Sequence, residues 1–101
     1  MSDAISLNIV SVLHPRFDLG RLLATPNALG ELSHDEILLA LGRHVRGDWG
    51  ELDPEDRSAN DHALQHGGRL FSAYVSANGG KFWIITECDR SATTVLLPED
   101  Y

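Results

Sequence analysis

The sequence has one cysteine, few basic residues and no long apolar run, and each shortage excludes a class of protein. Cys88 has no second cysteine for an internal disulfide, which is typical of a cytoplasmic protein. No stretch approaches the ~20 apolar residues of a membrane span. The start, residues 1–4, lacks the basic region of a signal peptide. We therefore expect a cytoplasmic protein with no membrane partner.

Basic residues are outnumbered by acidic ones. Eight Lys and Arg against fifteen Asp and Glu give a formal net charge of −7 and a pI near 5.0. Because a nucleic-acid backbone attracts positive surfaces, nucleic acid is not expected as a direct partner. The chain also has no Gly-rich loop after a predicted strand, so we expect no nucleotide cofactor. Its 101 residues, 43% of them hydrophobic, fit a single domain over residues 1–101.

Two helices are predicted from their start signals. Ser33 and Glu36 have the spacing of a capping box, and apolar residues then recur at helical intervals, so we predict a helix over 33–46 that Gly47 ends. Asp53 followed by Pro54 predicts a second helix over 54–65. The apolar stripe of this second helix is narrow, which indicates a surface position.

From residue 69 onward the pattern alternates as in strands. Segments 69–75, 81–87 and 93–97 are rich in aromatic and β-branched residues, and turn signals separate them. The turn at 78–80, Asn-Gly-Gly, is typical of a tight hairpin. The sequence therefore predicts an α+β fold in which N-terminal helices pack on a C-terminal three-stranded antiparallel meander, with 81–87 as its central strand.

The N-terminal third is less regular. Residues 4–13 fit either a strand or a short helix, 17–24 form a second extended candidate, and 27–32 fit a short helical turn after Thr25. We expect eight apolar side chains in or beside the core: Leu38, Leu41, Val45, Phe71, Ile84, Ile85, Val95 and Leu96.

Four sequence blocks carry a resemblance to a known family. They are residues 42–50 (GRHVRGDWG), 66–74 (HGGRLFSAY), 81–87 (KFWIITE) and 89–101 (DRSATTVLLPEDY). Together they resemble a family of small uncharacterised bacterial proteins from plasmids and integrated mobile elements, some of which carry plasmid-related or restriction-modification-associated labels. The resemblance covers residues 17–101, and residues 1–16 diverge. It implies an accessory role on a mobile element.

One group of side chains has the composition of a nuclease site. Glu87 would be the general base, His66 the general acid, and Arg69 and Arg90 would stabilise a phosphorane, with Thr93 nearby. The alternative is that these residues serve strand ends and turns. If the catalytic interpretation holds, the protein is a small metal-independent endoribonuclease or toxin-like nuclease.

Two further features have structural and functional interpretations. His62 and His66 have the spacing of two metal ligands on a helix, but Ala63 stands where zinc proteases have a glutamate and no third ligand is evident, so we expect no metal. Cys88 lies between two carboxylates, which raise a thiol pKa and oppose use as a nucleophile.

The segment from residue 48 to residue 61 concentrates negative charge. Its six acids against Arg57 give a local charge of −5. This charge fits a solvated helix face or an acidic surface for a basic protein partner. In the second interpretation the protein is non-enzymatic and binds another macromolecule, for example a nucleic-acid enzyme. Trp49 is then either an exposed anchor for the partner or a lid on the core. The candidate partner-binding residues are Asp48, Trp49, Glu51, Glu55, Asp56 and Asp61.

Overall fold

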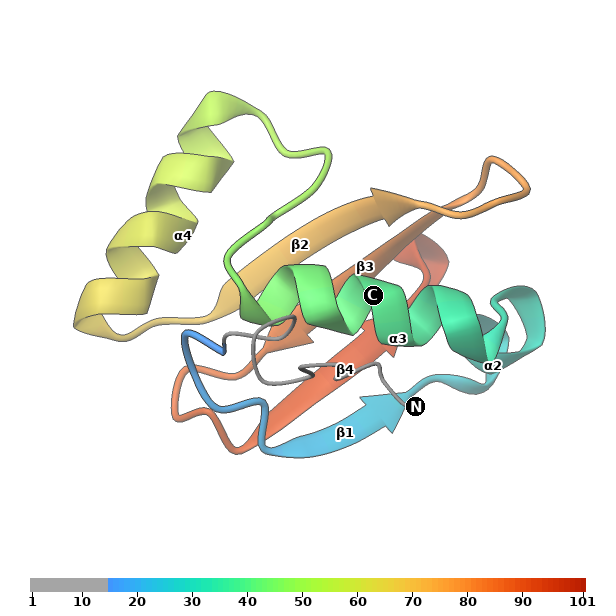
Figure 1. Ribbon diagram of the computed structural model, residues 1–101, viewed down its shortest axis with the longest axis horizontal. Coiled ribbons are helices and arrows are strands. Elements are labelled where there is room, and N and C mark those ends of the chain that lie inside the picture. The colour runs from blue at the N-terminus through green and yellow to red at the C-terminus, as the bar shows by residue number, and fades with distance from the viewer. Residues whose placement is uncertain (1–14) are drawn as a thin grey trace, which may run out of the picture.

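The computed structural model describes residues 15–101, which form an α+β fold with a four-stranded mixed sheet and three helices. In Figure 1 helix α3 crosses one face of the sheet, and α4 stands beside the β2 edge. The strands are β1 (Arg21–Ala24), β2 (Leu70–Val75), β3 (Lys81–Thr86) and β4 (Ala92–Leu96). The helices are α2 (Pro26–Glu31), α3 (His34–Val45) and α4 (Pro54–His66), and a short 3₁₀ helix, η1 (Pro98–Asp100), follows β4.

The sheet differs from the predicted one by a fourth strand. Its order is β1-β4-β3-β2, and the pairs β2–β3 and β3–β4 are antiparallel. Strand β1 pairs with β4 in parallel, with Arg21 opposite Ala92 and Ala24 opposite Val95. A purely antiparallel three-stranded sheet is therefore wrong. The extended candidate 17–24 supplies β1, and the segment 4–13, which fits either a strand or a short helix, lies outside the described residues.

The helix signals read from the sequence correspond to real caps. The Ser33 side chain accepts a hydrogen bond from the backbone N–H of Glu36, and the Glu36 carboxylate accepts one from Ser33 N–H, both at 3.1 Å. Asp53 caps α4 by accepting from the N–H of Asp56 at 2.9 Å. Gly47 follows α3 with a φ of 85°, a left-handed conformation that glycine adopts without steric cost.

The core has two clusters of buried residues. One joins α2 and α3 to the sheet through Leu41, Tyr74, Ile84 and Val95, and the other gathers around the buried residues Trp49, Leu52 and Leu70. Of the eight expected core residues, Leu41, Val45, Ile84, Ile85, Val95 and Leu96 are buried, and Phe71 packs against the second cluster.

Leu38 was expected in the core, and this was wrong. Its side chain is 65% exposed, because the buried side of α3 runs through Ala40, Leu41, His44 and Val45 instead. The apolar stripe read from the sequence is wider than the surface that the sheet covers, and Leu38 lies at its uncovered margin.

The outer edge of β2 is closed by side chains and a loop. The amide of Asn60 on α4 donates to the carbonyl of Phe71 at 2.5 Å and accepts from its N–H at 3.1 Å. Ala73 exchanges backbone hydrogen bonds with Trp49 and Glu51. These contacts fix α4 and its preceding loop to the sheet edge, which blocks the edge against further strand pairing.

Candidate functional site

Arg90, one of the two expected phosphate-stabilising arginines, is used inside the fold. Its guanidinium donates to the carbonyl oxygens of Gly68 at 2.6 Å and Ala63 at 3.1 Å, at the end of α4. It also donates to the carbonyls of Glu87 at 3.1 Å and Cys88 at 3.3 Å in its own turn. The last carbonyls of a helix lack partners within the helix. Arg90 supplies such a partner and ties α4 to the β3–β4 turn.

The side chains of the other three catalytic candidates, His66, Arg69 and Glu87, take no part in these hydrogen bonds, which Arg90 makes to backbone carbonyls. Arg69 donates to the Tyr101 hydroxyl at 2.6 Å, and its guanidinium carbon lies 5.4 Å from the centre of the Tyr101 ring. His66 lies against His62, with ring centres 4.5 Å apart, and both rings are exposed. Glu87 is exposed just beyond the end of β3.

The two arginines also face different hollows. Arg69 lines a cleft of about 320 Å³ with Trp83 and Ile85, on the sheet face away from α3. Arg90 lines a groove of about 680 Å³ with Leu41 of α3, on the opposite face. General acid–base catalysis requires its groups within hydrogen-bond reach of one substrate. The structure does not bring these two guanidinium groups to one concave site.

The expected acidic partner surface is divided by its internal contacts. Asp48 forms two hydrogen bonds with Arg43, from Nε at 2.7 Å and from Nη2 at 3.2 Å. The hydrogen bond from Arg43 holds the pKa of Asp48 below its ordinary value, against the opposing effect of desolvation. Because an arginine neutralises it, Asp48 adds little to an acidic docking surface.

Trp49 does not offer an exposed ring to a partner. It is 4% exposed, and its indole N–H donates to Asp61 Oδ1 at 3.0 Å. The Phe17 ring stacks near it at 6.3 Å between centres. Trp49 therefore covers the core, and the alternative of an exposed anchor for a partner is wrong.

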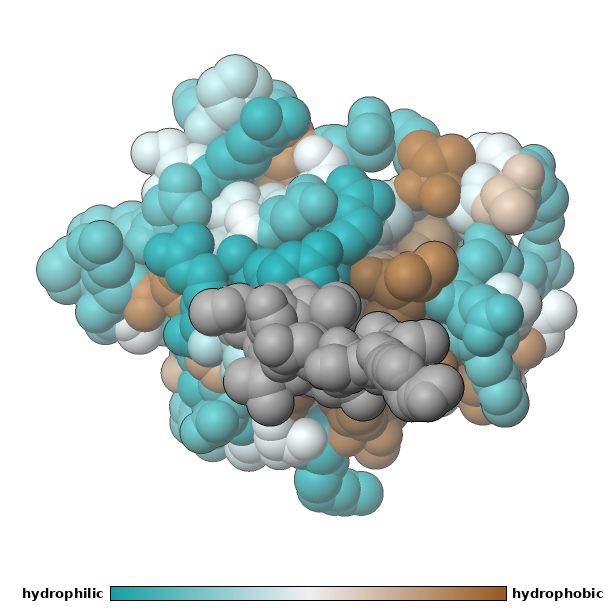
Figure 2. Space-filling model, in the orientation of Figure 1, coloured by the Kyte–Doolittle hydropathy of each residue, from teal (hydrophilic) through white to brown (hydrophobic). Residues whose placement is uncertain are grey.

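The remaining carboxylates lie in the loop before α4 and on α4 itself as far as Asp61. Asp53 and Asp61 accept from neutral N–H groups, and Arg57, the cation of this segment, donates Nε–H to the Leu52 carbonyl at 3.0 Å. The exposed carboxylates that remain, which we call the acidic surface, are Glu51, Asp53, Glu55, Asp56 and Asp61. Figure 2 shows hydrophilic residues over this part of the molecule.

The acidic surface is not a single stripe. Successive residues of a helix are about 100° apart around its axis. Asp56 therefore faces the cleft that it lines beside Asn60, whereas Asp61 faces the loop at Trp49. A partner would contact the N-terminal end of α4 and the loop before it, and not one long side of the helix.

A buried polar chain is the main feature that the sequence did not predict. His44 Nδ1 lies 2.5 Å from Ser72 Oγ, and its Nε2 lies 2.9 Å from Thr86 Oγ1. Thr86 Oγ1 lies 2.7 Å from Thr93 Oγ1, which donates to the Leu19 carbonyl at 2.6 Å. Each of the four side chains is 0% exposed.

The chain contains a hydroxyl within reach of a histidine, which is the geometry of an activated nucleophile. Burial leaves no path by which a substrate reaches Ser72, so the pair does not form an active site in this conformation. The signal for His44 was present in the sequence. It lies seven residues after Ile37 and three after Leu41, and therefore on the buried side of α3.

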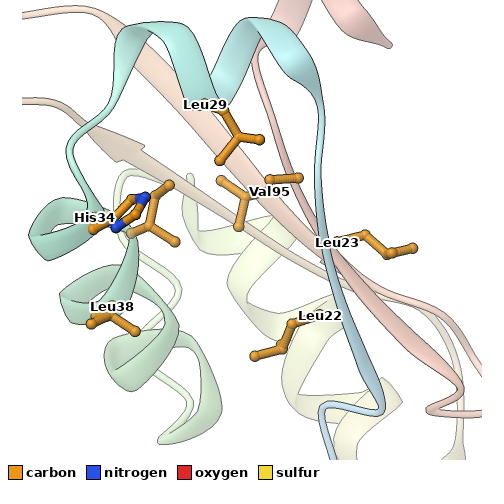
Figure 3. Close-up of a pocket in the computed structure, with 8 residues that line it drawn as sticks. Leu22, Leu23, Leu29, His34, Leu38 and Val95 are labelled. Atoms are coloured by element: carbon orange, nitrogen blue, oxygen red, sulfur yellow. The ribbon is translucent and has the colours of Figure 1, made fainter.

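An open apolar groove runs between α3 and β1. Figure 3 shows Leu22 of β1 and Leu38 of α3 on its two sides, with Val95 of β4 and Leu29 close together toward one end. The hollow drawn there has a volume of about 380 Å³, and the larger groove of about 680 Å³ shares Leu22 and Leu38 with it. Both leucines are more than half exposed, at 55% and 65%. Apolar side chains make up most of the lining of both hollows.

Residues 15–101 show neither a cluster of metal-binding side chains nor a helix that could span a membrane. In that range no three His, Cys, Asp or Glu side chains are grouped so as to hold a metal ion. None of the helices within the same range has the length and apolar character needed to cross a membrane. Comparison of the chain with protein-family models, curated protein sequences and solved structures finds no match.

Proposed function

We propose that the protein is a non-enzymatic accessory protein of a mobile element, which binds a macromolecular partner through a basic surface of that partner. A nucleic-acid enzyme of a restriction or defence system is the class of partner that we propose. The observation that carries the proposal is the acidic surface at the N-terminal half of α4. Of the 13 residues of this helix, Asn60 and Ala63 are buried, so it contributes little to the core for its length.

The charge of this surface supports recognition rather than stability. The Arg57 guanidinium is held by a backbone carbonyl, and the bonds of Asp53 and Asp61 come from uncharged donors. Exposed carboxylates contribute little to folding, but they raise the rate of encounter with a basic partner. The absence of a shared pocket for Arg69 and Arg90, and the burial of Ser72 and His44, support a non-enzymatic role.

The proposal predicts that neutralising the acidic surface slows association without unfolding the protein. The test variant carries Glu51→Gln, Glu55→Gln and Asp56→Asn. The matched control carries Glu31→Gln, Asp35→Asn and Glu87→Gln, which removes three exposed charges elsewhere. Asp35 lies in the first turn of α3 as Glu55 and Asp56 lie in that of α4, so both variants lose a favourable helix-dipole interaction.

A partner is first captured with the wild-type protein and identified by mass spectrometry, and its association rate is then measured by stopped flow. We expect fast association at low ionic strength that falls steeply with added salt, since screening acts over ~8–10 Å. The test variant should associate more slowly and with a weaker salt dependence, and the control should behave as wild type. Circular dichroism verifies the fold of each. Equal rates and equal salt dependence for all three proteins would leave the acidic surface a solubility feature only.

A further inference from the structure

A chain of four hydrogen bonds starts at His44 of α3 and joins it to three strands and to the segment before β1, and three of the four bonds are buried. We infer that His44 is held neutral, with its proton on Nε2, and that it is an acid-sensitive latch that fastens α3 to the sheet. The inference rests on the direction of the hydrogen bonds, the burial of every member and the charge of the neighbouring groups.

The direction of each proton follows from one end of the chain. The Leu19 carbonyl can only accept, so Thr93 uses its single hydroxyl proton there. Thr93 must then accept from Thr86, and Thr86 must accept from Nε2–H of His44. This places the proton of the neutral ring on Nε2, and leaves Nδ1 to accept from the Ser72 hydroxyl. One tautomer satisfies all four bonds.

A second proton on the ring conflicts with this arrangement. It would lie on Nδ1 and meet the hydroxyl proton of Ser72, which must turn away from the ring. The resulting charge would lie at a site with 0% exposure. A buried charge without a counter-ion is costly. Protonation therefore opposes the packing of α3 on the sheet.

Among residues 15–101, the groups described around the His44 ring are neutral or positive. Strands β2, β3 and β4 present the neutral hydroxyls of Ser72, Thr86 and Thr93. The loops present the Phe17 ring at 5.3 Å and the Trp49 ring at 5.7 Å.

The charged group that acts on the ring from the β3–β4 turn is Arg90, which is also positive. Burial, the larger cause, and the positive charge of Arg90 together lower the pKa of His44 from 6.5 to about 4.

The sign of the pH dependence follows. Between pH 6.5 and about 4 the unfolded chain takes up a proton on this histidine and the folded protein does not. Stability due to the latch is complete above pH 6.5 and is lost as the pH falls toward 4. The folding equilibrium constant should fall by about 100-fold over this range. Carboxyl groups of model compounds titrate near pH 4, at the acidic end of this window.

The experiment measures urea unfolding of the full chain by circular dichroism at a series of pH values. Wild type should lose stability between pH 6.5 and about 4. A matched control with His14, His34, His62 and His66 all replaced by glutamine should keep that loss, since His44 remains. His44→Gln, which has a donor and an acceptor but no titration in this range, should lose most of the slope. A wild-type protein whose stability is constant over the window, or a control that loses the slope, would overturn the latch.

A second measurement does not depend on the variants folding. Nitrogen NMR of the wild-type imidazole distinguishes a protonated ring nitrogen from an unprotonated one. At neutral pH we expect the His44 signal to show a proton on Nε2 and none on Nδ1. A proton on Nδ1 at neutral pH, with or without one on Nε2, would contradict the proton directions on which the inference rests.

Discussion

At the scale of single residues, Arg90 shows how a side chain that suggests catalysis can serve the fold. It has a φ of 61°, a left-handed conformation that is unusual for a residue other than glycine. The strained backbone aims the guanidinium at carbonyls of α4 and of its own turn. The hydrogen bonds of one charged group to several carbonyls compensate for the strain of its backbone.

Two substitutions separate these effects. Arg90→Ala removes the guanidinium and keeps the backbone strain, whereas Arg90→Gly removes both. We expect Arg90→Ala to lower the free energy of unfolding by about 2 kcal/mol, because the carbonyls of Gly68 and Ala63 lose a charged donor. Arg90→Gly should be more stable than Arg90→Ala by about 1 kcal/mol. Urea denaturation measures both, and an Arg90→Gly protein less stable than Arg90→Ala would contradict the role assigned to φ.

At the scale of elements, α3 and α4 both begin at a side-chain N-cap, but they pack on the sheet to different extents. Helix α3 buries Ala40, Leu41, His44 and Val45 against the sheet, whereas α4 is attached mainly through the Asn60 amide and a small apolar contact at Ala63. An exposed helix fixed at one edge is suited to present charged groups to a partner.

Two of the three leucines of α3, Leu38 and Leu41, test how far its buried side extends. Leu41 is 7% exposed and Leu38 is 65% exposed, although both belong to the apolar stripe of the sequence. Leu41→Ala should lower the free energy of unfolding by about 2–5 kcal/mol through the cavity that it leaves. Leu38→Ala should cost no more than about 0.5 kcal/mol, as other exposed sites do. Chemical denaturation of the two variants compares them, and equal costs would contradict the described packing.

At the scale of the whole molecule, contacts between distant parts of the chain close the fold. The Asp100 carboxylate accepts from the Thr25 hydroxyl at 2.6 Å, from the Asn27 amide at 2.7 Å and from the Leu97 N–H at 3.0 Å. These bonds join the residues after β4 to the start of α2. The bond from Thr25 is the main cause that holds the pKa of Asp100 below its ordinary value.

Replacing Asp100 should therefore have a pH-dependent effect. A carboxyl with a lowered pKa stabilises the fold at neutral pH and loses that effect as the pH falls below its ordinary value of about 4. Asp100→Asn should lower the thermal unfolding midpoint at neutral pH, and the difference from wild type should narrow in acid. Differential scanning calorimetry at several pH values follows this difference. A gap that widened in acid would show that another group is responsible.

Local signals determined most of the elements. The capping box at Ser33, the Asp53–Pro54 start of α4 and the Asn-Gly-Gly turn each act within a few residues, so they can be read without knowledge of the rest. The α+β class follows from their order. The cluster of acidic residues before and within α4 can also be read from the sequence. Most of those carboxylates remain exposed in the fold, so the tertiary structure changes their surroundings little.

The tertiary structure alone decided which residues meet across the chain. Strand β1 finds its partner β4 some 70 positions later, and Thr93 bonds Leu19 at a separation of 74 residues. The same long-range contacts bury His44, leave Leu38 outside and turn Arg90 toward backbone carbonyls. Periodicity specifies which side of an element is apolar, but what covers that side depends on loop closure and on the packing of distant elements. For this reason the elements could be predicted from the sequence, whereas the latch at His44 and the division of the acidic surface could not.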